Sequence, residues 1–245
     1  SPYVLSYSSL TVDPGVTLNI EPGVVIKFLP VDQDLIIGGT LKALGAADDN
    51  IVFTSFFDDE YGGDTNGDGN TTSPSPGNWR TILFNSTSQG SELSYVRARY
   101  GGKWYSGQGI GNSLVKVDGT AVNISNSIFE KSYQSGLRLR DAAGKIENST
   151  IHDNNFDDSS YGIIVEGGSP EIKDNTLERN HSGLALFYRT RAAVSGNNFL
   201  SNEREAVIFG DGAPIFSANR ALGNGINGIV VSGGFTDDYT FAKDL

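Results

Sequence analysis

Cysteine is absent from this 245-residue chain, and histidine and tryptophan occur only 2 times each. The absence of cysteine excludes disulfide bonds, thiol catalysis and cysteine-ligated zinc. Basic residues are also scarce: 18 Lys and Arg stand against 29 Asp and Glu, which gives a net charge of -11 and a pI near 4.6. This balance argues against nucleic acid as a partner, because phosphates require a basic surface. No apolar run approaches the roughly 18 residues of a membrane span, so none is expected.

The chain repeats one pattern five times between residues 124 and 224. An apolar anchor is followed three residues later by Asn or Ser, and eight residues later by Asn or Ser again. The anchors are Ile124, Ile146, Ile172, Val194 and Phe216; the third positions are Ser127, Ser149, Asn175, Asn197 and Asn219; the eighth positions are Ser132, Asn154, Asn180, Asn202 and Asn224. The spacing is therefore 22, 26, 22 and 22 residues. A fixed period in this range indicates a solenoid.

Short β-branched runs punctuated by Gly, Pro and Asn fill each repeat, a pattern typical of strands and turns. No segment between residues 110 and 235 has apolar residues at helical spacing over the roughly 11 residues that a helix requires. A coil of this length with three short strands matches a parallel β-helix, in which each coil pairs with its neighbours. Asn is expected at one corner because it tolerates left-handed backbone and its amides stack from coil to coil.

On these repeats the sequence resembles the right-handed parallel β-helix repeat proteins of bacterial cell surfaces, which include secreted polysaccharide-associated proteins. The resemblance covers nearly the whole chain. It implies an all-β, right-handed parallel β-helix (solenoid) of about nine or ten coils of roughly 22 residues. It does not fix an activity, because the group includes lyases, hydrolases, epimerases, tailspikes, adhesins and inert stalks.

We expect one domain, residues 1–245, with two insertion loops at 57–78 and 100–112. Short apolar runs around Pro-Gly turns in the N-terminal half continue the coil pattern. Residues 235–245 break it and form either a cap or a linker. The pattern is compatible with a place in a longer multidomain chain.

The first insertion loop contains a candidate calcium site. Asp64, Asn66 and Asp68 alternate and precede Gly69, which reproduces the first half of an EF-hand loop, with a backbone carbonyl at Asn70. Position 12 of such a loop is Ser75 instead of the bidentate Glu, so Asp58 or Asp59, or Glu60, would complete the shell. The alternative is a solvated acidic loop with turn-forming Gly and Asn. We predict a structural Ca²⁺.

The second insertion loop places Trp104 and Tyr105 side by side in a Gly-rich segment. Exposed aromatic residues beside polar groups suit stacking on a sugar ring or a protein contact. The alternative is that the loop folds back over its own apolar surface. We predict a binding role for this pair.

One predicted column of carboxylates is a candidate for catalysis: Asp118, Asp141, Glu166 and Asp211 each follow the same short strand of a coil. Neighbouring coils would place two such groups about 5 Å apart, and alternate coils about 10 Å, which straddles the separations found in glycosidases. Five cationic side chains lie in the same region and could accept an acidic sugar: Lys116, Arg138, Arg140, Arg189 and Arg191. The alternative is that these carboxylates only cap turns, since Asp118, Asp141 and Asp211 directly precede Gly or Ala.

Three functions remain open. The favoured interpretation is a non-enzymatic extracellular or cell-surface module, structural or adhesive, with a calcium-stabilised loop and an extracellular polysaccharide or another cell-surface ligand as partner. The second is a polysaccharide lyase or glycoside hydrolase that uses the carboxylate column. The third is an assembly module whose end coils stack on other chains, which would follow if residues 235–245 leave the last coil uncovered.

Overall fold

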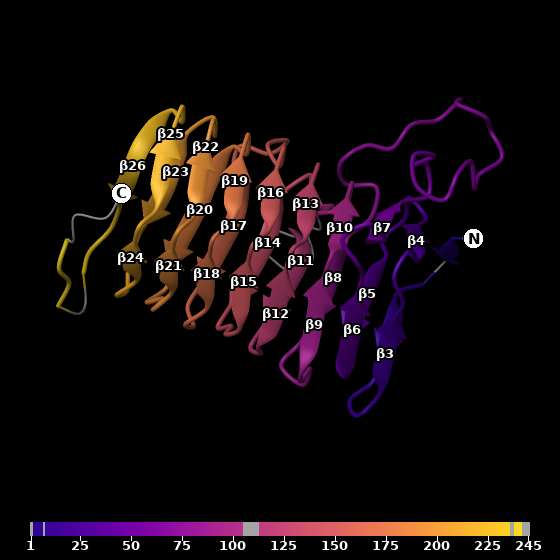
Figure 1. Ribbon diagram of the computed structural model, residues 1–245, viewed down its shortest axis with the longest axis horizontal. Helices are drawn as coiled ribbons and strands as arrows, with labels where there is room; N and C mark the ends of the chain where they lie inside the picture. The colour runs from indigo at the N-terminus through magenta and orange to yellow at the C-terminus, as the bar shows by residue number, and fades with distance from the viewer. Residues whose placement is uncertain (1, 7, 105–112, 236–237, 242–245) are drawn as a thin grey trace.

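The computed structural model describes residues 2–6, 8–104, 113–235 and 238–241, and this part of the chain contains strands and no helix. The chain passes through three sheets in turn and then begins the next coil, so the coils stack into an elongated rod with the two termini at opposite ends (Figure 1). All neighbouring strands within the sheets pair in parallel. The predicted solenoid is therefore confirmed.

The three sheets are named here in chain order. The first sheet contains β1 (Tyr3–Leu5), β4 (Val25–Phe28), β7 (Ile51–Ser55), β10 (Val96–Arg99), β13 (Ile128–Glu130), β16 (Thr150–His152), β19 (Thr176–Glu178), β22 (Asn198–Leu200) and β25 (Arg220–Leu222). The second sheet contains β2 (Leu10–Val12), β5 (Asp34–Ile37), β8 (Thr81–Phe84), β11 (Ser113–Asp118), β14 (Ser135–Arg140), β17 (Tyr161–Glu166), β20 (Ser182–Phe187), β23 (Glu205–Phe209) and β26 (Ile226–Val231). The third sheet contains β3 (Thr17–Ile20), β6 (Thr40–Leu44), β9 (Ser91–Ser94), β12 (Val122–Ser125), β15 (Lys145–Glu147), β18 (Glu171–Lys173), β21 (Ala193–Ser195) and β24 (Ile215–Ser217).

The core is a set of apolar columns that run along the inside of the rod. Alternate side chains of each strand point inward, and parallel pairing brings equivalent positions of successive coils into register. In the first sheet one such column consists of Phe53, Ala98, Phe129, Ile151 and Leu177, all fully buried. Burying each of the larger side chains contributes about 1.5–3 kcal/mol, so the stacked columns stabilise the fold.

The polar residues of the repeat form two buried ladders. The first ladder lies where the third sheet turns into the first, and the second lies where the first turns into the second. Where the next ladder residue is Asn, its amide oxygen accepts N–H groups from the preceding coil: the backbone N and Nδ2 of Asn175 both lie 3.0 Å from Oδ1 of Asn197. Between Ser127 and Ser149 the acceptor is the hydroxyl oxygen of Ser149. Nδ2 of Asn175 also donates to the carbonyl of Ile146 at 2.8 Å. The predicted stacking of these side chains is confirmed.

The left-handed backbone falls one residue earlier than the sequence pattern predicts. In the first ladder positive φ belongs to the residue that precedes each ladder residue, with values between 49° at Asn148 and 67° at Gly196. The ladder residues themselves are not in this conformation. The amides therefore recur for their hydrogen bonds to the next coil, and the explanation from backbone tolerance is wrong for these positions.

The two ends of the rod differ. At the C-terminal end, the rings of Phe235 and Tyr239 stack on each other and pack against Phe209, with centroid distances of 5.4, 5.7 and 5.2 Å. These contacts favour a cap over a linker for the described residues of the 235–245 segment. At the N-terminal end, an apolar hollow of about 490 Å³ opens between residues of the first coils, such as Leu18 and Ile26.

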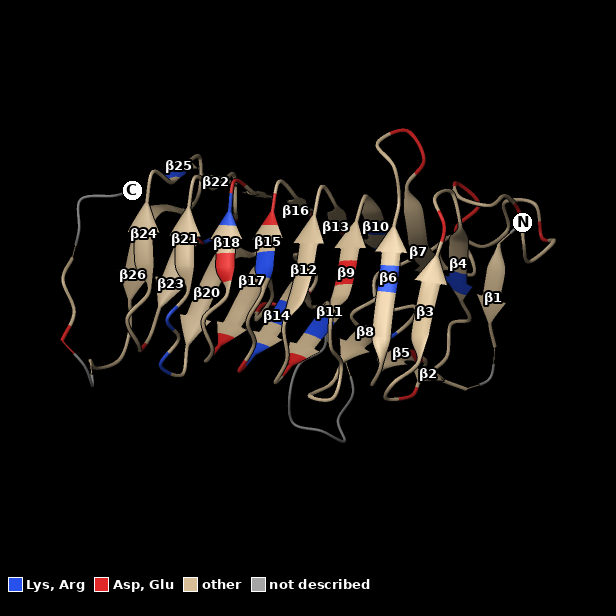
Figure 2. Ribbon diagram, turned by 60° about the horizontal axis from the view of Figure 1, so that its bottom comes forward, with Lys and Arg blue, Asp and Glu red and all other residues tan. Residues whose placement is uncertain are grey.

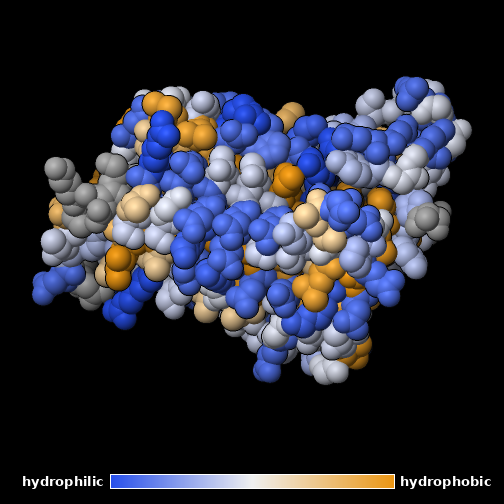
Figure 3. Space-filling view, viewed as in Figure 1, coloured by the Kyte–Doolittle hydropathy of each residue, from blue (hydrophilic) through white to orange (hydrophobic). Residues whose placement is uncertain are grey.

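The surface in the orientation of Figure 3 is mostly hydrophilic, and its hydrophobic side chains are scattered in small groups. Among the described residues no helix is long and apolar enough to cross a membrane.

Candidate functional site

The first insertion loop joins β7 to β8 and extends from the N-terminal end of the rod (Figure 1). Arg99 on β10 attaches this loop to the outer face of the first sheet. Its guanidinium donates to Glu60 at 2.6 Å and lies over the ring of Tyr61, 5.4 Å from the centroid. This hydrogen bond holds the pKa of Glu60 below its ordinary value. The loop is thus anchored to the β-helix at its first residues.

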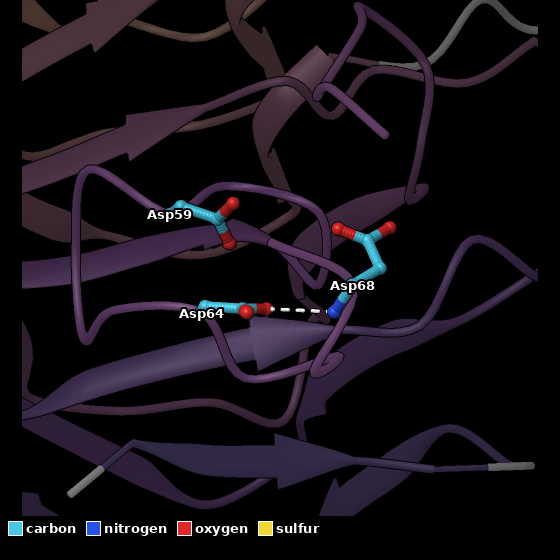
Figure 4. A group of neighbouring side chains, drawn as sticks. All are labelled: Asp59, Asp64 and Asp68. Carbon is cyan, nitrogen blue, oxygen red and sulfur yellow. Dashed lines mark hydrogen bonds between the residues drawn. The ribbon is translucent and has the colours of Figure 1, made fainter. Parts of the chain in front are cut away.

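Three carboxylates of the loop converge. Asp59, Asp64 and Asp68 each offer one oxygen atom, and these atoms lie within 4.8 Å of one another. In Figure 4, the three side chains come from separate stretches of the loop and point toward a common space. Such a group of hard oxygen donors is the type that calcium prefers.

Unsatisfied oxygen atoms give this group a second feature of a cation site. Oδ1 of Asp59, Asn66 and Asp68 are buried and accept no hydrogen bond within the described part of the chain. A buried acceptor without a partner costs about 1–3 kcal/mol, and more when it is charged. A cation held by the three carboxylates would give Asp59 and Asp68 a partner for these oxygens. The residues present therefore fit calcium.

The loop backbone already holds Asp64 in place. Its two carboxylate oxygens accept N–H groups from Gly67 at 2.8 Å, Asp68 at 3.2 Å and Gly69 at 2.9 Å. These hydrogen bonds, that from Gly69 above all, lower the pKa of Asp64, so the carboxylate is ionised and oriented. The predicted alternation of oxygen-bearing side chains thus corresponds to a tight turn around Asp64.

One of the predicted ligands, Asp58, has other partners. Asp58 is not among the converging carboxylates, contrary to the prediction: its Oδ2 accepts from the hydroxyl of Thr54 and lies 3.7 Å from Nε of Arg99. Asn70 is exposed. Of the three residues that the sequence offered to complete the shell, Asp58, Asp59 and Glu60, it is Asp59 that joins the group.

A buried lysine lies beneath the loop. Nζ of Lys27 donates to the carbonyl of Gly63 at 2.6 Å. Burial lowers the pKa of Lys27, and the nearby Asp59, Asp58 and Asp64 offset part of that effect. The hydrogen bond to Gly63 joins the loop to β4 of the first sheet.

The predicted column of four carboxylates is wrong in register. Parallel pairing aligns Asp118 with Arg140, Arg140 with Glu166, and Glu166 with Phe187. Asp141 comes one residue after the end of β14, with a left-handed φ of 45°, and lies outside this column. The structure therefore places a cation, and not a second carboxylate, on the coil between Asp118 and Glu166.

Both carboxylates of this column form ion pairs with arginine side chains. Arg138 donates to both oxygens of Glu166, at 2.8 and 2.6 Å, and Arg140 makes a bidentate pair with Asp118. Bidentate pairs of this kind are strong and fix both partners geometrically. Arg138 and Arg140, predicted to bind ligand, thus have internal partners. Burial lowers the pKa of the neighbouring Lys116.

Of the predicted aromatic pair, Trp104 is 57% exposed and Tyr105 lies outside the described residues. Asp211, the fourth carboxylate, lies 3.9 Å from Nε of Arg189. The second tryptophan, Trp79, is fully buried and stacks on Phe28 with ring centroids 4.2 Å apart.

Sequence reasoning offered Arg189 as one of five cations that could accept an acidic sugar, but it did not predict the backbone of this corner after β20. Tyr188 and Arg189 have φ values of 56° and 60°, and among the described residues they are the only consecutive non-glycine residues with positive φ. Left-handed backbone costs a non-glycine residue about 1–2 kcal/mol. The preceding coil has Gly167 and Gly168 after β17, where positive φ carries no such penalty. The two glycines at the equivalent corner of the preceding coil were the sequence feature that could have indicated positive φ here.

Tyr188 presents its side chain to solvent in spite of this backbone strain. The residue is 71% exposed, and its ring makes an edge contact with Phe187, whose ring in turn contacts Tyr161; both centroid distances are 6.4 Å. Strained residues persist where the surrounding structure holds them, and they concentrate at functional sites. The corner is therefore a second candidate site.

The fold defines the class of this protein as a parallel β-helix, built from strands and corners in three sheets. The family described as right-handed beta helix region matches residues 84–244, more than half of the chain, and the chain belongs to this family. None of the curated proteins compared with the chain matches it. A solved structure of endopolygalacturonase I from Stereum purpureum, complexed with two galacturonate, is similar over 100% of this chain and 95% of its own, with a TM-score of 0.35 and 11% identity.

Proposed function

We propose that the chain is a non-enzymatic module of the extracellular space or a cell surface, a rigid β-helix that is structural or adhesive, carries calcium in its acidic loop and binds an extracellular glycan. The observation that carries this proposal is that arginine side chains pair with two of the four candidate catalytic carboxylates, Asp118 and Glu166. A general acid must hold a proton for its substrate, and a general base must have a free oxygen. Glu166 and Asp118 instead accept hydrogen bonds from guanidinium groups on both oxygens.

The distance between Asp118 and Glu166 does not by itself support a mechanism with two catalytic carboxylates. Asp118 and Glu166 are two coils apart, about 10 Å at the usual strand spacing, which exceeds the 6.5–9.5 Å range of inverting glycosidases only slightly. The side chain of Arg140 lies between them and pairs with Asp118. A scaffold role requires only that this face is stable, and the ion pairs serve that role.

The calcium part of the proposal rests on the three converging carboxylates and on the unsatisfied oxygens beside them. Bound calcium would neutralise the repulsion among Asp59, Asp64 and Asp68 and would close the loop on the first sheet. A ligand present at 100 times its dissociation constant stabilises the folded state by about 2.7 kcal/mol. We therefore expect calcium to raise the melting temperature of metal-free protein by about 5–10 °C.

The test compares thermal unfolding after chelation and after calcium is restored, together with calcium titration by calorimetry. Asp68→Asn removes one charge of the group, and Asp48→Asn is the matched control, because Asp48 is an exposed carboxylate outside it. We expect Asp68→Asn to weaken calcium binding and Asp48→Asn to leave it unchanged. A melting curve that is the same with chelator and with calcium would contradict the calcium site.

A further inference from the structure

We propose that Asn66 is a site of self-modification: its side-chain amide is lost through attack by the backbone nitrogen of Gly67 when the turn around Asp64 opens, and bound calcium keeps this turn closed. The product is aspartate or isoaspartate at position 66. The calcium dependence rests on the proposed function, whereas the dependence on the turn rests on hydrogen bonds within the loop itself.

The reaction needs only the chain and water. The nitrogen of Gly67 gives up its proton and forms a bond to Cγ of Asn66, the bond from Cγ to Nδ2 breaks, and ammonia leaves. Glycine favours this attack because it has no Cβ to hinder the nitrogen. Water then opens the cyclic imide: addition at Cγ gives aspartate, and addition at the backbone carbonyl carbon gives isoaspartate with a longer main chain. No oxidant or reductant is consumed.

The Asn–Gly pairs of the chain lie in unlike surroundings; they are Asn66–Gly67, Asn224–Gly225 and Asn227–Gly228. The amide of Asn224 belongs to a buried ladder, where Nδ2 donates to the carbonyl of Phe199 at 2.9 Å. Asn227 lies within β26, and its Oδ1 accepts the Nδ2 of Asn224 at 2.8 Å. Asn66 instead lies in the acidic insertion loop, outside the strands. Its surroundings can therefore open without unfolding of the β-helix.

Two hydrogen bonds hold the reacting groups of Asn66 and Gly67. The backbone N of Gly67 donates to Oδ1 of Asp64 at 2.8 Å, and Nδ2 of Asn66 donates to Oγ1 of Thr72 at 2.8 Å. An N–H group that donates to a carboxylate retains its proton, so its nitrogen is a poor nucleophile. The hydrogen bonds that Asp64 accepts lower its pKa, which also makes this carboxylate a weak base. The closed turn thus disfavours the reaction at both groups.

Both hydrogen bonds lead to the converging carboxylates. Asp64 is one of these carboxylates, and Thr72 donates from Oγ1 to Oδ2 of another, Asp68, at 2.6 Å. With Asp59, their oxygens lie within 4.8 Å of one another, so the three negative charges repel when no cation is bound. A cation would remove this repulsion and hold Asp64 and Asp68 in place. The metal content of the loop therefore sets how often the turn opens.

The products change the loop in different ways. Oδ1 of Asn66 is buried and accepts no hydrogen bond within the described residues. Aspartate at this position adds a negative charge and a harder oxygen donor to the loop that carries the three carboxylates. Isoaspartate lengthens the backbone and breaks the alternation of oxygen-bearing side chains. A period without calcium thus leaves a lasting change in the loop.

The experiment incubates the protein at mildly alkaline pH with calcium or with chelator, and peptide mass spectrometry follows the loss of each Asn–Gly amide. Calcium at 100 times its dissociation constant lowers the population of metal-free protein about 100-fold. We therefore expect Asn66 to react about tenfold or more slowly with calcium than with chelator. Asn224 should stay intact in both, and the rate at Asn227 should not depend on calcium. Equal rates at Asn66 would overturn the calcium dependence.

Matched threonine variants test the turn separately. Thr72→Val removes the acceptor of the Asn66 amide and should speed the reaction several-fold at saturating calcium. Thr71→Val is the control, because the hydroxyl of Thr71 donates to the carbonyl of Asp68 instead. Equal rates in the parent and both variants would overturn the role of the turn. Asn66→Gln should abolish the mass change in this peptide, since its longer side chain closes the ring poorly.

Failure of the calcium site and failure of this inference give different results. If calorimetry detects no calcium binding, the calcium part of the proposed function fails, yet Thr72→Val must still react faster than the parent and Thr71→Val. If calcium binds and raises the melting temperature while Asn66 stays intact in chelator, the calcium site stands and the modification site is overturned.

Discussion

At the scale of single residues, the buried asparagines are the most informative feature of the sequence. Asn180 illustrates why: its Nδ2 donates to the carbonyl of Ile151 at 2.9 Å and to Oδ1 of Asn202 at 3.2 Å. Its own Oδ1 accepts from the backbone N and from Nδ2 of Asn154 at 3.2 and 2.9 Å. One side chain thus satisfies polar groups on the coils before and after it.

Asn180→Ala should therefore be strongly destabilising. The substitution leaves the polar groups of both neighbouring coils without partners in a fully buried position. We expect a loss of about 3 kcal/mol in the free energy of unfolding, measured by denaturant titration. Asn155→Ala is the control, because Asn155 is exposed and its Nδ2 donates to the exposed Glu203 at 2.6 Å. Equal losses for the two variants would show that the ladder does not carry this stability.

At the scale of elements, the acidic loop depends on its attachment to Arg99. The folded-state pKa of Glu60 lies below the ordinary value of 4.5, first because of its hydrogen bond from Arg99. A carboxylate with a lowered pKa stabilises the fold above 4.5, and this contribution is lost as the pH falls through the folded-state value. Acid should therefore loosen the loop.

Glu60→Gln tests that attachment through its pH dependence. We expect the variant to melt below the parent protein at pH 7, by a small margin because Glu60 is largely exposed. The difference should shrink below pH 4.5 as Glu60 of the parent takes up a proton. Melting temperatures measured for both proteins between pH 7 and pH 3 supply the comparison, and a difference that does not change with pH would count against the ion pair.

The period of the sequence predicted the coils, whereas residue type misplaced the carboxylates. Asp118, Asp141 and Glu166 were aligned because each precedes a corner. The period of 22 residues itself pairs Asp118 with Arg140, and the structure has this register. In a sheet a shift of one residue turns a side chain to the other face, so alignment by residue type failed where the repeat length succeeded. Asp59, Asp64 and Asp68 were predicted correctly as neighbours because their spacing is local.

The backbone of the corner at Tyr188 was not predicted, because the two large side chains at positions 188 and 189 give no local sign of positive φ. Gly167 and Gly168 in the preceding coil offered the signal, since two glycines at one corner indicate a left-handed backbone that the next coil also adopts. Functional strain of this kind appears only when the conformation is known.

At the scale of the whole molecule, the β-helix is a rod with unlike ends. Aromatic side chains of the last segment cover Phe209 at one end, and an apolar hollow opens at the other. Along its length, arginine–carboxylate pairs occupy the outer face of the second sheet and an acidic loop lies over the first. This arrangement suits a rigid binding module better than a catalyst.

The most direct test of this account incubates the protein and calcium with a panel of polysaccharides, acidic and neutral, and sizes the products by mass spectrometry. The account predicts that every polysaccharide stays intact, including one that the protein binds. The account would be contradicted by shortened or unsaturated oligosaccharides that the parent protein produces and that the Glu166→Gln or Asp141→Asn variant does not. Such products would make those carboxylates an active site.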